Sequence, residues 1–451
     1  MFNSRRELKV LFLGQTFKYE FNSEKSELKL LIDEEKNDFF IAKSLNISKI
    51  MSIKNELIIL EDKSLIWHIK DCEYCFANEI KFIIDYTIEL YSENFEITTV
   101  ELKSTALDSV LHPANYFYHN RNLAKNDILY DIIEMKKFNF YFEKTKINVS
   151  VYVGNLLKRG ICSKLTNNIT LSLNFQPTND IKKICNLIDY VRNALKILLY
   201  SNDLEFNNIE LRDSKNSYTG RIFEMQRYIS EPGRLAKSNK LYFNDIMNKI
   251  FNNIDKLDVS KLSLIKNNYD NKDYCMKLIN LFAMFESNFK LKFKKFKSPK
   301  IDIEQAEIID KCVEFLSNYY SKDNNEQFIE SLKNRIKTYN NSSFSKLRYA
   351  MHYYCQKLII EEKPSLTSSR LKWLYYKGWN VNDNINEDDI ETSAKRLQAL
   401  RNTIVHTEEI PLIEKIDEFW IDAFELVIYA MMLDNLGLTD NEILEHFNTF
   451  F

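Results

Sequence analysis

The chain has 451 residues, enough for two or three domains of about 150 residues each. It is 45% hydrophobic and 28% charged, which suits a globular protein, and its net charge of −2 means that any nucleic-acid binding must use a local basic surface. Only 7 glycines are present, and they form neither G-x-x-x-x-G-K nor G-x-G-x-x-G, which excludes P-loop, Rossmann and protein-kinase phosphate loops.

Short runs of β-branched and aromatic residues predict strands through the N-terminal part of the chain. They are residues 28–32, 56–60, 65–69, 138–142, 147–153 and 169–175. The last three alternate at a period of two, which is typical of half-buried strands in an antiparallel sheet. After Pro177 the apolar residues of 181–198 fall on one helical face, which predicts a helix that packs on the sheet.

Residues 213–240 contain several breakers and are predicted to be a connection, and from about residue 241 the helical period dominates. Helices are predicted at 272–297, 303–319, 325–338, 343–361, 388–405 and 411–435. Pro411 suits the first position of the last one. The predicted fold class is α+β, with a β-rich N-terminal domain over 1–230, an antiparallel sheet with a packed helix, and an all-α bundle over 240–451.

Cys72-Glu73-Tyr74-Cys75 forms a C-x-x-C, but no second pair follows at the spacing of a zinc site. The pattern favours ordinary cysteines near a strand and leaves metal or redox use open, so no metal and no cofactor are predicted. An odd total of 7 scattered cysteines fits a reducing compartment. The apolar run at 10–13 is too short for a signal peptide, and no stretch approaches the ~20 apolar residues of a membrane span. We therefore expect a cytoplasmic protein without a membrane partner.

A lysine-rich run follows the aromatic stripe that begins at Phe282. Its members, uninterrupted by any acid, are Lys290, Lys292, Lys294, Lys295, Lys297 and Lys300. Lysines neutralise phosphates, so this run is a candidate contact for nucleic acid. The alternative is a solvated helix face, with the interleaved Phe293 and Phe296 buried in the core rather than free to stack on bases.

The segment 390–406 places a guanidinium where the helical period predicts a packed seam. Ile390, Ala394 and Leu397 mark this seam, and Arg401 takes its next position. A buried arginine needs a partner, so Arg401 either pairs with a buried acid or faces an interface that admits an anionic ligand. His406 lies about 140° further round an ideal helix, so two copies related by a two-fold axis could present both residues to one cleft more easily than one helix can.

Arg401-Asn402-Thr403-Ile404-Val405-His406 resembles the R-x(4–6)-H signature of HEPN ribonucleases, including the polar residue directly after the arginine. Residues 278–286 resemble the acid-bearing first helix of the ApeA-like HEPN group. That group also has a long helical spacer before the motif and a β-rich domain in front of it. The resemblance covers residues 240–451, and over 1–230 it extends to general layout only.

The resemblance implies metal-independent RNA cleavage in a site assembled across a homodimer or a larger even-numbered assembly. In this role His406 would act as general acid or base, because an imidazole exchanges protons near neutral pH. Arg401 would hold the scissile phosphate and stabilise the phosphorane, with Asn402 in support. Glu286 would pair with Arg401 or shape the site, and the run that begins at Lys290 would contact the RNA backbone.

Similar proteins act in anti-phage defence by abortive infection, in which a phage-derived trigger releases the nuclease against host RNA such as tRNA. The β-rich domain would then be the sensor or brake, an expectation that rests on fold-level analogy. Two alternatives stay open: a catalytically inactive HEPN-type module that binds RNA or nucleotides, and a protein-interaction module. Expected products, by the same resemblance, are a 2′,3′-cyclic phosphate and a 5′-hydroxyl.

Overall fold

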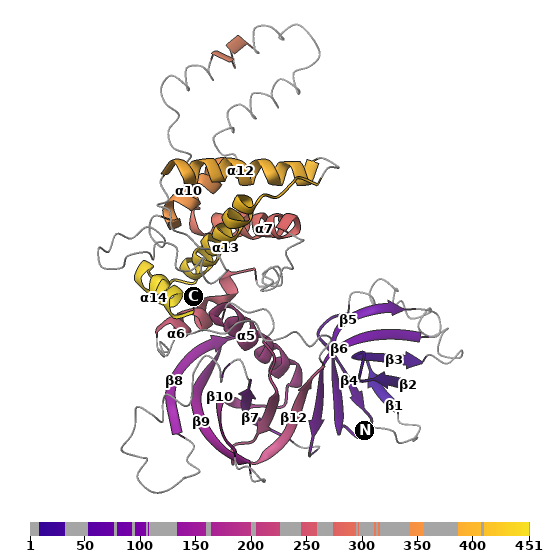
Figure 1. Cartoon of the computed structure of the whole chain (residues 1–451). Helices are drawn as coiled ribbons and strands as arrows, with labels where there is room; N and C mark the ends of the chain where they lie inside the picture. The colour runs from indigo at the N-terminus through magenta and orange to yellow at the C-terminus, as the bar shows by residue number, and fades with distance from the viewer. Residues whose placement is uncertain are drawn as a thin grey trace. The chain divides into compact units, whose positions relative to one another are not determined.

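The computed structural model describes residues 9–31, 53–75, 79–92, 95–104, 107, 133–158, 164–199, 204–225, 245–258, 274–294, 296, 311–312, 314–315, 343–355, 387–406 and 410–450. The chain divides into two compact units, Met1–Ile254 and Asp255–Phe451 (Figure 1). The first contains all the described strands and the second is helical, so the α+β class predicted from the sequence is confirmed. The predicted helices at 303–319 and 325–338 lie almost entirely outside the described residues.

Six strands at the start of the first unit close into a ring. They are β1 (Lys9–Phe12), β2 (Gln15–Asn22), β3 (Glu27–Leu31), β4 (Glu56–Leu60), β5 (Leu65–Cys75) and β6 (Glu79–Leu90). Neighbours in the order β3-β2-β1-β4-β5-β6 are antiparallel, and a further pairing of β3 with β6 closes the ring. Alternate residues point inward, where Phe12, Phe17 and Phe82 form an apolar core with Trp67.

The remaining strands extend the sheet from the C-terminal half of β6. In spatial order they are β12 (Tyr218–Glu224), β11 (Asn208–Arg212), β7 (Ile97–Lys103), β10 (Lys164–Thr178), β9 (Thr145–Lys158) and β8 (Ile133–Phe142). Helix α5 (Ile181–Leu199) packs on this part, as predicted (Figure 1). The Phe140 ring stacks on Tyr190 of the helix at 5.4 Å between centroids, so the helix and the sheet share one apolar layer.

Helix α6 (Asp245–Asn253) lies in the first unit, although its sequence groups it with the helices that follow. The Tyr190 hydroxyl donates a hydrogen bond of 2.5 Å to the carbonyl oxygen of Phe251. The Phe251 ring also lies 5.3 Å from that of Phe140. The boundary between the units therefore falls after Ile254, because the apolar partners of α6 are on the sheet and on α5.

Strand β12 lies within 213–240, so the expectation of a plain connection there is wrong. Gly220 explains why this segment can pair with β6. A Cβ atom at Gly220 would lie only 2.4 Å from the carbonyl oxygen of Glu89 on β6, closer than real side chains approach. Glycine marks a turn in most sequence patterns, but here it permits close approach of two strands.

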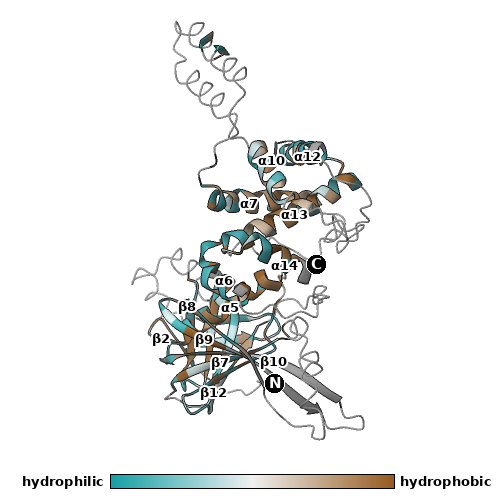
Figure 2. Ribbon diagram, turned by 90° about the vertical axis from the view of Figure 1, so that its left-hand side faces the viewer, coloured by the Kyte–Doolittle hydropathy of each residue, from teal (hydrophilic) through white to brown (hydrophobic). Residues whose placement is uncertain are grey.

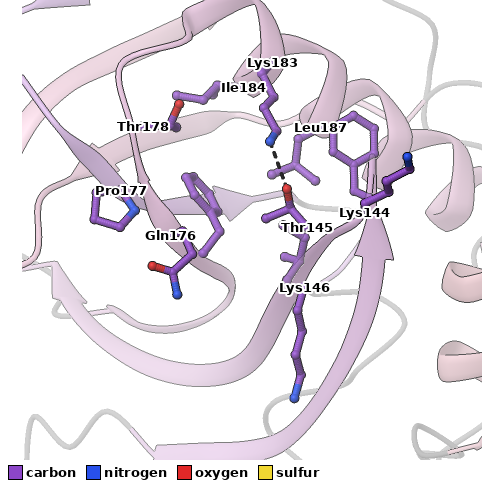
Figure 3. A pocket seen from close by; sticks show the side chains of 12 residues that line it. Lys144, Thr145, Lys146, Gln176, Pro177, Thr178, Lys183, Ile184 and Leu187 are labelled. Carbon is purple, nitrogen blue, oxygen red and sulfur yellow. Dashed lines mark hydrogen bonds between the residues drawn. The ribbon is translucent and has the colours of Figure 1, made fainter.

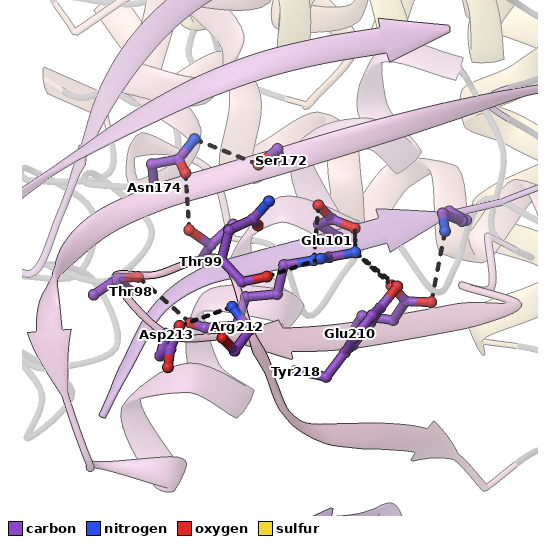
Figure 4. A network of polar contacts seen from close by, with 12 residues as sticks. Thr98, Thr99, Glu101, Ser172, Asn174, Glu210, Arg212, Asp213 and Tyr218 are labelled. Carbon is purple, nitrogen blue, oxygen red and sulfur yellow. Dashed lines mark hydrogen bonds and ion pairs between the residues drawn. The ribbon is translucent and has the colours of Figure 1, made fainter. Parts of the chain in front are cut away.

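A polar network covers the face of the sheet opposite the inward-pointing residues of β7 and β11 (Figure 4). Arg212 contacts Glu101 of β7 at 3.1 Å and Glu210 of its own strand at 3.2 Å. Its guanidinium also lies 4.0 Å from the ring centroid of Tyr218 on β12. One arginine thus links three neighbouring strands, and its charge is balanced by the two carboxylates.

The second unit is a helical bundle. Its helices are α7 (Tyr274–Lys292), α10 (Ser343–Tyr354), α12 (Glu387–His406), α13 (Lys415–Asn435) and α14 (Asp440–Phe450). Helix α13 is buried around nearly its whole circumference, with hydrophobic residues along its length (Figure 2). Such a helix can only be the centre of a bundle, and α7, α10, α12 and α14 all contact it.

Helix α13 begins at Lys415, so the prediction that Pro411 occupies its first position is wrong. A capping box starts the helix instead: the Glu414 side chain accepts from the backbone of Asp417, whose carboxylate accepts from the Glu414 N–H at 3.0 Å. These two reciprocal hydrogen bonds satisfy the backbone N–H groups of Glu414 and Asp417. A helix that began at Pro411 would not use them in this way. The segment 410–414 therefore precedes the helix as a non-helical stretch.

The buried His446 of α14 makes the stability of this unit depend on pH. Burial lowers the pKa of His446 to about 3, and the neutral ring contacts the Tyr429 hydroxyl at 2.7 Å. The histidine is neutral in both states above pH 6.5, and between pH 6.5 and 3 only the unfolded chain takes up the proton. We expect the free energy of unfolding to fall by about 2 kcal/mol between pH 7 and pH 5 from this residue, at about 1.4 kcal/mol per pH unit.

Urea unfolding of the protein and of His446→Gln at both pH values measures this effect. Glutamine keeps an acceptor for Tyr429 but does not titrate, so the variant should lose about 2 kcal/mol less on acidification. Equal losses in the two proteins would show that His446 is not the group responsible.

Candidate functional site

The candidate site lies on the C-terminal half of α12, where the buried seam ends. Ile390, Ala394 and Leu397 are fully buried, and Arg401 follows at the next seam position, half-buried. Its guanidinium carbon lies 5.9 Å from the ring centroid of Phe282 on α7, within the range of a cation–π contact. Arg401 thus follows the buried side of α12, where the helical period had placed it. Its described partner on α7 is the aromatic ring of Phe282.

Asn402 is exposed and is held by two donors. Its side-chain oxygen accepts from Arg401 Nη1 at 3.2 Å and from Gln398 Nε2 at 2.9 Å. The carboxamide therefore turns its NH₂ group, which can only donate, away from the guanidinium. The Arg401 guanidinium keeps further N–H donors beyond the one given to Asn402, and these suit an anionic oxygen.

His406 is the last residue of α12 and its ring is exposed. Solvent-exposed imidazoles can meet a substrate without any rearrangement of the bundle. The five-residue separation from Arg401 turns the two side chains about 140° apart on the same helix. Within one chain, therefore, α12 brings Arg401 and Asn402 together, and it directs His406 elsewhere.

An ion pair fixes the corner between α12 and α13, next to this motif. Arg396 Nε and Nη2 each lie 2.9 Å from an oxygen of Asp417, a bidentate contact. Burial by itself would raise the pKa of Asp417, but the hydrogen bonds from Arg396 and from the Glu414 N–H hold that pKa below its usual value. The carboxylate that caps α13 thus also anchors α12, which determines where His406 emerges.

Glu286 and the start of the basic run, Lys290 and Lys292, lie on α7, the helix whose Phe282 faces Arg401. Phe282, Glu286 and Lys290 follow at four-residue spacing and so form one row on the helix surface. Glu286 is half-buried and Lys290 is exposed. In the described part of the chain, no ion pair joins Glu286 to Arg401, so the expected pairing is not present within one subunit.

The remaining lysines of the run differ in availability. Lys292 forms an ion pair of 2.5 Å with Asp434 of α13, whose other oxygen accepts from the Tyr354 hydroxyl at 2.8 Å. Its ammonium therefore holds α7, α10 and α13 together. Because it is paired in this way, Lys292 is not available for the expected contact with RNA. Lys294 is exposed. Lys295 lies outside the described residues.

Four exposed apolar side chains lie close to His406 in sequence, and we call them the apolar cluster; the sequence patterns did not predict it. Val405, Ile410, Leu412 and Ile416 are 46%, 86%, 79% and 56% exposed. Large apolar side chains exposed within one short stretch of chain are candidates for contact with another molecule. The signal in the sequence is the Ile-Pro-Leu-Ile stretch of 410–413, which lies outside any helical period.

The C-x-x-C motif contributes nothing to this site. Cys72 is buried in the core of the strand ring, and the side chain of Cys75 lies outside the described residues. In the part of the chain that the structure describes, no three His, Cys, Asp or Glu side chains gather as a metal site. None of the described helices combines the length and apolar character that a bilayer crossing requires.

Comparison with known proteins found no matching family model, no matching curated protein and no matching solved structure.

Proposed function

We propose that this chain is a metal-independent endoribonuclease of the HEPN type, with an active site built from Arg401, Asn402 and His406 of two copies. One observation carries the proposal. Arg401 is half-buried, its guanidinium has an aromatic ring and an amide as its described partners, and the same helix ends in an exposed imidazole that is close in sequence to the apolar cluster. A cation without a carboxylate partner is suited to an anionic ligand.

In this mechanism His406 removes the proton of the ribose 2′-hydroxyl, and the freed oxygen attacks the adjacent phosphorus. The bond from phosphorus to the 5′-oxygen breaks, and the imidazolium of the second copy protonates that leaving oxygen. Arg401 binds the non-bridging oxygens and stabilises their extra charge in the transition state, with Asn402 donating from the same side. The products are a 2′,3′-cyclic phosphate and a 5′-hydroxyl.

The geometry of α12 supports an active site that two copies share. Arg401 and His406 point about 140° apart, so one helix does not turn both toward the same phosphate. The apolar cluster of Val405, Ile410, Leu412 and Ile416 offers a surface that a two-fold contact would cover, and an isologous contact would bring the two motifs together. The exposed Lys290 on α7 and Lys294 just beyond its end remain the candidates for RNA backbone contact.

The wider role that we propose is abortive infection in the cytoplasm, as in the proteins that the motif resembles. The β-rich unit would then respond to a phage-derived trigger, and host RNA, with tRNA among the candidates, would be the target. These assignments rest on the resemblance and on the two-unit organisation of the chain.

The proposal is tested by changing the apolar cluster and not the catalytic residues. Ile410→Asp combined with Leu412→Asp should turn a dimer into a monomer and abolish RNA cleavage, because two carboxylates would be forced into the contact. Both side chains are exposed in the single chain, so the melting temperature should change little. Light scattering, thermal melts and cleavage of end-labelled RNA with and without EDTA measure these effects.

Leu13→Asp is the matched control, since Leu13 is 50% exposed in the first unit, and it should leave both dimerisation and cleavage unchanged. Cleavage by the unmodified protein that stops in EDTA would reject the metal-independent mechanism. RNA binding without any cleavage would favour the inactive HEPN-type module instead.

A further inference from the structure

A cavity of about 350 Å³ opens in the β-rich unit, between the β8–β9 hairpin, the end of β10 and the first turns of α5 (Figure 3). Its inner walls are apolar. They are formed by Phe142, Ile147, Phe175, Pro177, Ile184 and Leu187. Phe175 and Pro177 are partly exposed, so a flat ring could lie against them without displacing the core.

The rim of the same cavity is cationic. Lys144, Lys146 and Lys183 line it, and no Asp or Glu occurs among the 12 lining residues. Lys183 Nζ reaches across from α5 to donate to Thr145 Oγ1 at 2.9 Å, a neutral partner that leaves its charge uncompensated. Its neighbour Lys182, by contrast, forms an ion pair of 2.8 Å with Glu56. Lys183 therefore places a positive charge at the opening of an apolar pocket, and Lys144 and Lys146 add two more on the hairpin that lines it.

The backbone holds one of these lysines in an unfavourable conformation. Glu143 and Lys144 form the tip of the β8–β9 hairpin with φ of 46° and 65°, a left-handed region that favours glycine. The equivalent tip between β1 and β2 uses Gly14, at φ of 77°. Lys63, in the turn between β4 and β5, has a similar φ of 57°, so the conformation belongs to these tight turns, and glycine at position 144 would adopt it without strain.

We propose that this cavity binds a nucleotide, with the base against Phe175 and Pro177 and the phosphate at the lysine rim. Inorganic phosphate alone would leave the apolar walls exposed to water. An uncharged aromatic ligand would leave the lysine ammonium groups without an anionic partner. Gln176 and Thr178 line the pocket as well, and their amide and hydroxyl can bond the polar edge of a heterocycle. A free nucleotide and the end of an RNA strand present the same base and phosphate, and the experiment below distinguishes these two sources. The site belongs to the β-rich unit and is independent of the proposed nuclease site.

Calorimetric titration of the full-length chain with AMP, adenosine and inorganic phosphate tests this proposal. AMP should bind with a Kd on the order of 10 µM, as a ligand of its size can reach in a preformed pocket. Adenosine and phosphate should each bind at least about tenfold more weakly, because each uses half of the site. Lys183→Gln should weaken AMP about tenfold, the effect of one charge-assisted hydrogen bond. The matched control Lys215→Gln, at an exposed lysine in the β11–β12 turn, should bind as the unmodified protein does.

Lys144→Gly separates binding from folding. Glycine relieves the positive φ, so this variant should melt at the same or a higher temperature while its affinity for AMP falls. A short RNA distinguishes the two sources, tested with a 5′-phosphate and with a 5′-hydroxyl in the His406→Ala background. Tighter binding of the phosphorylated strand than of AMP identifies an RNA end as the ligand. Tighter binding of AMP identifies a free nucleotide. Absence of binding by both AMP and the phosphorylated strand, or affinities that Lys183→Gln and Lys144→Gly leave unchanged, would overturn the proposal.

Discussion

Replacing His406 or Arg401 by alanine should lower the rate of RNA cleavage by roughly 10³-fold or more, the largest functional effect that we expect in this chain. His406 supplies proton transfer in the proposed mechanism, and Arg401 supplies charge stabilisation, so neither can replace the other. The His406 ring is exposed and Arg401 is half-buried at the edge of the bundle. The fold should therefore survive both changes, with circular dichroism spectra and dimer formation like those of the unmodified protein. Cleavage of end-labelled RNA in EDTA measures the effect.

Lys395→Ala is the matched control for these variants. Lys395 lies on the same helix, and its 3.0 Å ion pair with Glu391 faces solvent, so its removal should leave cleavage unchanged. Persistent cleavage in His406→Ala or Arg401→Ala would remove the basis of the proposed function. A loss of cleavage that comes with a large fall in melting temperature would show that the residue supports the fold instead.

The largest expected effect on stability comes from Lys277, which is buried in the bundle between two acids. Its ammonium contacts Asp422, and it lies 2.7 Å from Glu425 Oε2, all three side chains being almost wholly inaccessible. Burial would lower the pKa of Lys277, but the charges of Glu425 and Asp422 raise it above its usual value, so the side chain is charged at neutral pH. Lys277→Met should lower the free energy of unfolding by about 3–5 kcal/mol, because two buried carboxylates would lose their cation.

Urea denaturation at pH 7 measures this loss. Adding Asp422→Asn and Glu425→Gln to Lys277→Met should restore much of the stability, since the neutral amides no longer need a counter-ion. Lys290→Met, at an exposed position of the same helix, should change stability by no more than about 0.5 kcal/mol. A loss of less than about 1 kcal/mol in Lys277→Met would show that the buried charges are compensated by other groups.

Local patterns predicted several elements closely. The run at 56–60 coincides with β4, and the helical period from 181 to 198 matches α5, which extends to Leu199. These elements have one apolar face or are apolar throughout, so the spacing of their own apolar residues is enough to predict a strand or a helix. Strand β12 was missed because Gly220, which is needed for its close contact with β6, has the local character of a turn.

The candidate site was predicted in part for the same reason. The period of α12 placed Arg401 on its seam, since that depends only on residues of one helix. This period could not show that Arg401 contacts Phe282 or that Lys292 forms an ion pair with Asp434. These contacts join residues more than a hundred positions apart.

The sequence by itself determined the α+β class, the periods of the main strands and helices, and the spacing of Arg401, Asn402 and His406, because each depends on neighbours in the chain. The tertiary structure alone decided that six strands close into a ring, that α6 belongs with the sheet, and that three lysines from two elements line one cavity. Those features depend on which surfaces meet when the core is buried, and no local pattern contains that information.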